Sequence, residues 1–129
     1  MISRISSLVA RSYRDLFVWR QARALVVEVY RSTEQFPKTE IYGLTSQIRR
    51  AAVSVVSNIA EGQGRLTPGE FVHFLGQARG SLLELDAQLL IASDLSYLHT
   101  KRYETLSNQI FQLLGPLNRL IDSLRRKHA

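Results

Sequence analysis

Four stretches of the chain repeat apolar residues at intervals of three and four positions, the spacing that places side chains on one face of an α-helix. Polar breaks separate them, and no stretch alternates apolar and polar residues as a half-buried strand would. Because short connections favour antiparallel neighbours, the pattern predicts an all-α, antiparallel up-down-up-down four-helix bundle. We expect the bundle to span residues 15–127, after a partly flexible N-terminal arm of residues 1–14.

Capping and breaking residues mark the ends of the first two predicted helices. The first is expected to begin after Asp15, a good N-cap, and to stop before Pro37. The second is expected from about Glu40 to Glu61, with Gly62 in the left-handed conformation that ends many helices. The predicted core positions are Leu16, Trp19, Ala22, Val26, Val29, Tyr30 and Thr33 in the first helix and Leu44, Ile48, Ala52, Val55 and Ile59 in the second.

The third helix has the strongest start signal in the chain. Thr67 can cap it, Pro68 suits the first helical position and Glu70 completes a capping box. The helix is expected to end near Leu98. Its predicted core positions are Phe71, Phe74, Leu75, Ala78, Leu82, Leu85, Leu89 and Ala92.

The fourth predicted helix begins after Thr100 and ends in a basic run that suits the negative end of the helix dipole. A kink is expected at Gly115-Pro116, because proline removes a backbone hydrogen bond. Its predicted core positions are Leu106, Ile110, Leu113, Leu117, Leu120 and Leu124.

One face of the third helix belongs neither to the core stripe nor to a polar surface. A glycine inside a helix costs about 1 kcal/mol relative to alanine, so two outward glycines four residues apart need a compensating contact. Small residues allow close approach by another helix, which favours a second subunit as the partner. Packing inside the monomer against the N-terminal arm is the alternative. The predicted subunit-contact residues are Gly76, Gly80, Leu83, Ala87 and Ile91, with Val53 and Val56 on the second helix.

Composition removes several classes of chemistry. The chain has no cysteine, which excludes disulfides, thiolate metal sites and cysteine nucleophiles and favours the cytoplasm. No apolar run is long enough to cross a membrane, so no membrane partner is expected. His73, His99 and His128 are scattered, and no pair of carboxylates is spaced to face one cleft. We therefore predict no enzymatic activity, no catalytic residue, no metal or other cofactor and no small-molecule substrate.

The charge of the chain points to an acidic partner. The net charge is +6, and all but three of the 17 basic residues are arginines, whose planar side chains suit phosphate and carboxylate groups. Nucleic acid is therefore a candidate partner. The alternative is that the arginines form solvated helix faces and ion pairs within the protein.

Several short motifs, in order along the chain, resemble one protein family. The match is to the bacterial four-helix bundle proteins first noticed as reading frames inside intervening sequences of 23S ribosomal RNA genes, and it covers about residues 13–124. The motifs are Tyr13-Arg-Asp-Leu-Phe-Val-Trp19, Phe36-Pro37, Tyr42-Gly43-Leu44, Gln47-Ile-Arg-Arg-Ala-Ala-Val53, Asn58-Ile-Ala-Glu-Gly62 and Gly80-Ser-Leu-Leu-Glu-Leu85.

The resemblance implies an antiparallel four-helix bundle assembled as a homopentamer, without established enzymatic activity and with a role in binding RNA or DNA. It also implies kinship with the accessory proteins of diversity-generating retroelements, which are basic pentameric bundles that bind nucleic acid and reverse transcriptase. Asn58 and Glu61 have a structural alternative, since they can satisfy polar groups at the end of the second helix. The family's motif residues, carried over by position, are Arg49, Arg50, Asn58, Glu61, Gly62 and Arg65.

Two functions from different classes remain in competition. The leading one is a homo-oligomeric scaffold, pentameric by resemblance, that binds RNA or DNA. The alternative is a protein–protein interaction adaptor with no nucleic-acid role. Arg49 and Arg50 can equally contact a neighbouring subunit. The candidate nucleic-acid contacts are Arg49, Arg50, Arg65, Arg125, Arg126 and Lys127.

Overall fold

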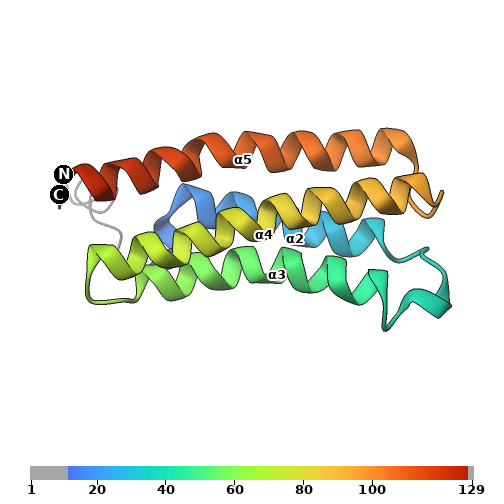
Figure 1. Cartoon of the computed structure of the whole chain (residues 1–129), viewed down its shortest axis with the longest axis horizontal. Coiled ribbons are helices and arrows are strands. Elements are labelled where there is room, and N and C mark those ends of the chain that lie inside the picture. The colour runs from blue at the N-terminus through green and yellow to red at the C-terminus, as the bar shows by residue number, and fades with distance from the viewer. Residues whose placement is uncertain (1–11, 128–129) are drawn as a thin grey trace.

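The computed structural model describes residues 12–127, and over that range its regular elements are all helical. Successive long helices run in opposite directions, as the colours in Figure 1 show. Each long helix packs against the next, and α5 also packs on α2 to close the bundle. The predicted all-α four-helix bundle is confirmed. The elements are η1 (Tyr13–Asp15), α2 (Phe17–Ser32), η2 (Lys38–Glu40), α3 (Leu44–Gln63), α4 (Pro68–Asp94) and α5 (Thr100–Lys127), where η denotes a 3-10 helix.

The predicted N-terminal arm falls mostly on residues 1–11, which lie outside the described residues. Its last residues form η1, which packs on α2 and α3, and the Tyr13 ring meets the Trp19 ring edge-on at 4.8 Å. Because Asp15 belongs to η1, the prediction that it caps α2 is wrong. The N-cap of α2 is Leu16, which makes no side-chain capping bond.

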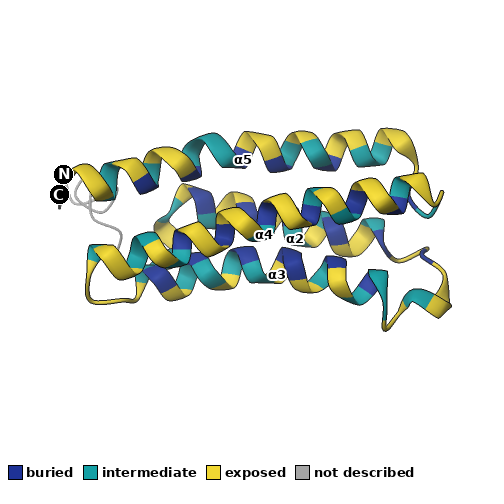
Figure 2. Cartoon of the chain, viewed as in Figure 1, coloured by how far each residue is buried: buried dark blue, intermediate teal, exposed yellow. Residues whose placement is uncertain are grey.

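The core consists of apolar side chains from all four long helices. Buried residues recur at intervals along each of these helices (Figure 2). In α3, α4 and α5 most of the predicted core positions are buried. The stripe of α2 is shifted, because the residues that point inward are Val18, Ala22, Leu25 and Val29. Trp19 and Val26 lie on a flank and are only partly buried, and Tyr30 is exposed.

The left-handed helix end occurs at a serine and not at the predicted glycine. Gly62 lies inside α3, which continues to Gln63. Ser96, at the end of α4, has a φ of 63°, and the N–H of Tyr97 donates to the carbonyl of Ala92 at 2.9 Å, the bond of a Schellman motif. α4 therefore ends at Asp94, four residues before the predicted end.

Gly62 serves close packing instead. An added Cβ at this position would lie 2.7 Å from Cβ of Phe74 and 3.0 Å from Cδ1 of Phe71, both on α4. Such distances are shorter than van der Waals contact, so any side chain here would push α4 away from α3. Local sequence offered no way to tell this role from a helix cap, because both select glycine.

Glu40 connects the two loops at one end of the bundle. Its Oε1 accepts from the backbone N–H of Leu44 at 3.1 Å, which caps α3, and its Oε2 accepts from the Tyr97 hydroxyl at 3.0 Å. The hydrogen bond, together with burial and the negative charge of Glu40, raises the pKa of the Tyr97 phenol. α3 consequently begins four residues after the predicted start, with the Glu40 carboxylate acting as its cap.

The starts of α4 and α5 agree with the sequence patterns. Thr67 Oγ1 accepts from the N–H of Glu70 at 3.1 Å, and Pro68 is the first residue of α4. α5 begins at Thr100 and continues through Pro116 as one helix of 28 residues, so the proline does not divide it.

Replacement of Gly62 by alanine tests the close contact between α3 and α4. We expect Gly62→Ala to lower the free energy of unfolding by about 1–2 kcal/mol, because the steric clash outweighs the gain in helix propensity. Urea denaturation measures the change. Gly64→Ala is the matched control: its Cβ would have only ordinary contacts, the nearest at 3.6 Å, so little loss is expected. Equal stability of the two variants would contradict this packing.

Candidate nucleic-acid interface

The six predicted cationic contacts do not share one surface. Arg49 is occupied in holding α3 to the end of α2. Its Nε donates to Thr33 Oγ1 at 2.9 Å, its Nη2 donates to the Tyr30 carbonyl at 3.4 Å, and its guanidinium lies 4.6 Å from the centre of the Tyr30 ring. These contacts give Arg49 a structural role between α3 and the end of α2.

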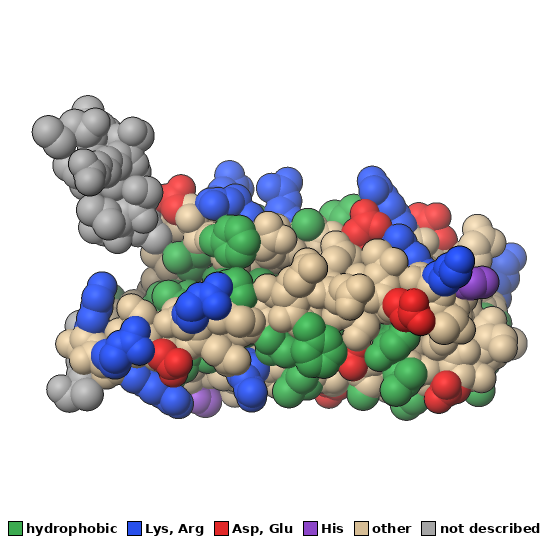
Figure 3. All heavy atoms as spheres, turned by 90° about the horizontal axis from the view of Figure 1, so that it is seen from above, with side chains coloured by type: hydrophobic (Ala, Val, Ile, Leu, Met, Phe, Trp, Pro, Cys, Tyr) green, Lys and Arg blue, Asp and Glu red, His purple; other side chains and the backbone are tan. Residues whose placement is uncertain are grey.

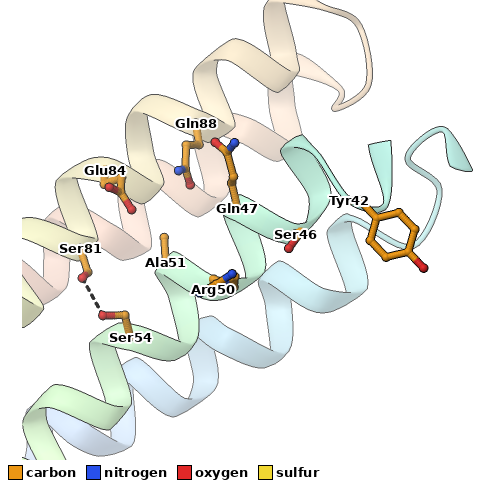
Figure 4. Close-up of a pocket in the computed structure, with 9 residues that line it drawn as sticks. All are labelled: Tyr42, Ser46, Gln47, Arg50, Ala51, Ser54, Ser81, Glu84 and Gln88. Carbon is orange, nitrogen blue, oxygen red and sulfur yellow. Dashed lines mark hydrogen bonds between the residues drawn. The ribbon is translucent and has the colours of Figure 1, made fainter. Parts of the chain in front are cut away.

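Arg50 lines an open groove of about 470 Å³ between α3 and α4. Figure 4 shows Glu84 and Gln88 on the α4 wall of this groove and Arg50 and Gln47 on α3. The groove contains one cation and one anion, so its charges offset each other and it offers little attraction to a phosphate. Apart from Ala51 its remaining lining carries polar groups, and Ser54 and Ser81 form a hydrogen bond of 2.9 Å there.

Arg65, at the turn between α3 and α4, also has intramolecular partners. Its Nη2 lies 3.0 Å from Glu61 Oε2, and its guanidinium lies 4.7 Å from the centre of the Phe74 ring. Asn58 donates to the Ser54 carbonyl at 2.8 Å, one turn earlier in α3. Asn58 and Glu61 therefore both have intramolecular partners, Asn58 within α3 and Glu61 at the turn that follows it.

The basic run at the end of α5 is different. Arg125, Arg126 and Lys127 are exposed, and their side chains make no hydrogen bond or ion pair with any other residue that the structure describes. They lie at the same end of the bundle as the turn between α3 and α4 (Figure 1). Three cations without intramolecular partners are available there for an external anion.

The charges of the whole bundle are divided unequally along its length. We call residues 12–26, 54–81 and 112–127, which form the end with the α3–α4 turn, the basic half. Among the described residues, the basic half contains nine Lys and Arg side chains and four Asp and Glu side chains, a net charge of +5. The other half contains six Lys and Arg side chains and seven Asp and Glu side chains, a net charge of −1. In Figure 3 blue side chains gather toward the left-hand end, where α5 ends.

A second groove, of about 440 Å³, lies between α4 and α5 within the basic half. Arg79 on α4 and Arg125 on α5 both line it, and the Nε of Arg79 donates to Asn118 Oδ1 at 3.0 Å. Arg79 is not among the cations that the sequence pattern indicated. Its position next to the core residue Ala78 could have placed it at the edge of the buried face of α4, but nothing local names α5 as the neighbouring helix.

The predicted subunit-contact residues lie on two different sides of the bundle. On α4, Leu83 and Ile91 are 40% and 49% exposed. Val53 is one turn after Arg49, which contacts α2, so it lies on the side of α3 toward α2. Val56 is partly buried against the core, and Val53 is 38% exposed. Among the predicted subunit-contact residues, Leu83 and Ile91 on α4 are therefore the most exposed large apolar side chains.

Residues 12–127 contain neither a metal-binding cluster of side chains nor a membrane-spanning helix. No group of three or more His, Asp or Glu side chains in this range is arranged to hold a metal ion. No helix in the same range has both the length and the apolar character needed to cross a bilayer.

Comparison with known proteins identifies the family. Residues 14–119 match the model of the 23S rRNA-intervening sequence protein. The chain belongs to this family. None of the curated proteins matches it. Within the solved structures, a protein of unknown function from the S23 ribosomal protein family of Bacteroides thetaiotaomicron is similar, with a TM-score of 0.75 and 19% identity over 81% of this chain and 97% of that one. At this identity the likeness concerns the fold, and neither description names an enzymatic activity.

Arg49 and Arg50 are adjacent in sequence but differ in their contacts, so substituting each of them should change the stability of the protein by different amounts. We expect Arg49→Gln to lower the free energy of unfolding by about 1–2 kcal/mol, because it removes bonds to Thr33 and Tyr30 and the ring contact. Arg50→Gln is the control and should be nearly neutral, since Arg50 is exposed. Thermal unfolding of both variants measures the difference. A larger loss for Arg50→Gln would refute the assignment.

Proposed function

We propose that this chain is a non-catalytic, homo-oligomeric helical bundle of the cytoplasm that binds RNA or DNA through its basic half. The observation that carries the proposal is the difference in net charge between the two halves of the bundle, +5 for the basic half and −1 for the other half, counted over the described residues. A field of one sign attracts a polyanion and orients it toward one end of the protein. Membership of a family described by reference to 23S rRNA supports nucleic acid over other polyanions.

The mode of binding that these residues support is electrostatic. Arg126 and Lys127 are exposed cations on the last turn of α5, free to meet phosphates. In the basic half, Phe17 is 52% exposed, whereas the other Phe, Tyr and Trp side chains are partly buried, so this half offers few open platforms for base stacking. Affinity should therefore depend strongly on salt and weakly on base sequence.

Neutralising part of the basic run tests the role of the basic half. We expect Arg126→Gln/Lys127→Gln to weaken binding of a short single-stranded RNA in fluorescence anisotropy. The slope of log affinity against log salt should fall by about 1–1.5, since each lost phosphate contact on a single strand contributes about 0.7.

The matched control is Lys38→Gln/Lys101→Gln, which removes the same charge from the other half of the bundle. It should leave the affinity and the slope close to those of the unmodified protein. If the two double variants lose affinity equally, the basic half has no special role. Absence of binding by the unmodified protein at low salt removes the proposed function.

Assembly into a homo-oligomer is the second part of the proposal. The outer face of α4 supports it, because Leu83 and Ile91 are exposed there beside Gly80 and Ala87. An added Cβ at Gly80 would meet nothing within 4 Å in the monomer, so the monomer itself does not explain the glycine. A helix of another subunit could approach closely at this point and bury the apolar side chains.

Sedimentation velocity tests the assembly. We expect the unmodified protein to sediment as an oligomer and Leu83→Asp/Ile91→Asp to sediment as a monomer, because a buried unpaired carboxylate is strongly unfavourable. Ile41→Asp/Leu66→Asp is the control, since it places the same charges at exposed apolar positions outside α4. A monomer at micromolar concentration for the unmodified protein would refute this part of the proposal.

The alternative, a protein-interaction adaptor, is favoured by one observation. Leu90 and Phe111 are 45% and 54% exposed, so apolar surface extends beyond the small-residue face of α4. Copurification of one discrete protein, unaffected by nuclease treatment, would support the adaptor over nucleic-acid binding.

A further inference from the structure

We propose that the groove between α4 and α5 is a phosphodiester-binding site, in which Arg79 and Arg125 hold one backbone phosphate of the bound nucleic acid. This inference rests on the proposed function and assigns a position to one of its contacts. Two arginines from different helices line the same groove of about 440 Å³. Guanidinium groups that converge on one space are the arrangement by which proteins commonly hold a phosphate.

Arg79 is oriented before any ligand arrives. Its Nε donates to Asn118 Oδ1 at 3.0 Å, while its two Nη groups make no hydrogen bond with any residue that the structure describes. An arginine held through Nε keeps its planar end in a restricted set of directions and so loses less freedom on binding. Asn118 is therefore a positioning residue for Arg79.

Gly76 keeps the groove open. It lines the groove, and an added Cβ there would meet nothing within 4 Å, so the fold of the monomer does not require glycine. Helix propensity favours alanine at such a position. A larger side chain at residue 76 would extend into the space that the proposed phosphate occupies. The phosphate site, and not the packing of the helices, therefore accounts for the glycine at this position.

Asp122 also lines the groove and opposes an anion. The groove therefore contains two cations and one anion, whereas the groove at Arg50 contains one of each. The excess of one positive charge distinguishes the two grooves. It also predicts that removal of the Asp122 charge strengthens phosphate binding.

Filling the groove without changing its charge is the decisive test. We expect Gly76→Leu to weaken binding of a short single-stranded RNA about tenfold, as loss of a charge-assisted contact would. Gly69→Leu is the matched control, because it makes the same substitution on the same helix, at a position that also has nothing within 4 Å of its Cβ but lines neither the groove nor the proposed subunit contact. It should bind within about twofold of the unmodified protein.

Three further variants examine the groove residue by residue. Arg79→Gln should weaken RNA binding to a similar extent as Gly76→Leu. Asn118→Ala keeps the net charge and should still weaken binding, because Arg79 loses its orientation. Asp122→Asn should strengthen it. General electrostatic attraction does not predict the effects of Gly76→Leu or Asn118→Ala, since neither substitution alters the charge.

A measurement without nucleic acid tests the phosphate site in the groove independently of the proposed binding of RNA or DNA. In ¹⁵N-edited NMR spectra, inorganic phosphate should shift the Arg79 Nε–H signal of the unmodified protein and not that of Gly76→Leu. A shift in the unmodified protein supports a phosphate site in the groove whether or not RNA binds. Absence of the shift overturns the site.

The remaining outcomes separate the two proposals. If RNA binding falls with Arg126→Gln/Lys127→Gln but not with Gly76→Leu or Asn118→Ala, the groove proposal is overturned and the proposed function stands. If phosphate shifts the Arg79 signal but none of the groove variants alters RNA binding, the groove takes a free phosphate ion and the phosphodiester assignment is overturned. If Gly76→Leu changes the sedimentation of the protein as Leu83→Asp/Ile91→Asp should, Gly76 belongs to a subunit contact, which also overturns the assignment.

Discussion

The close contact between α3 and α4 at Gly62 is the constraint on which the remaining structure depends. Because Gly62 has no side chain, Phe71 and Phe74 pack directly against the end of α3, and a short turn is enough to reverse the chain. α4 then presents its buried stripe to the core and its flank to α5, where Asp86 accepts from Ser107 at 2.7 Å and Asn118 accepts from Arg79 at 3.0 Å. The groove between α4 and α5 is a consequence of this register.

The antiparallel arrangement also determines how charge is distributed. Acidic residues concentrate in the half with Glu40, where one carboxylate caps α3 and holds Tyr97, and another, Glu28, pairs with Arg102 through Nη2 at 2.6 Å. Many charges of that half are thus used within the fold. The basic run at the end of α5 is exposed and makes no such pair with the part of the chain that the structure describes. The positive field is therefore the part of the charge distribution that remains available to a ligand.

α4 has two outward surfaces with different chemistry, and the proposals assign them to different partners. The flank toward α5 contains Gly76 and Arg79 and faces a charged groove. The outer face contains Gly80, Leu83 and Ile91 and is apolar. In the proposed assembly, subunits that meet through the outer face would bring several basic halves into one particle, and several weak phosphate contacts on one strand reinforce each other.

Local sequence determined the helices, because helix periodicity, the Thr67-Pro68 start and the inward stripes of α3, α4 and α5 depend only on neighbouring residues. It also supplied the cations of the candidate site. Tertiary structure decided which of them have partners in other helices: Arg49 is bound to α2, Arg65 lies over the Phe74 ring of α4, and the α5 run pairs with no residue in the range 12–127. It likewise decided that Gly62 is a packing residue and that Arg79 and Arg125 line the same groove. These facts depend on which helices become neighbours and at what register, and residues far apart in the chain set both.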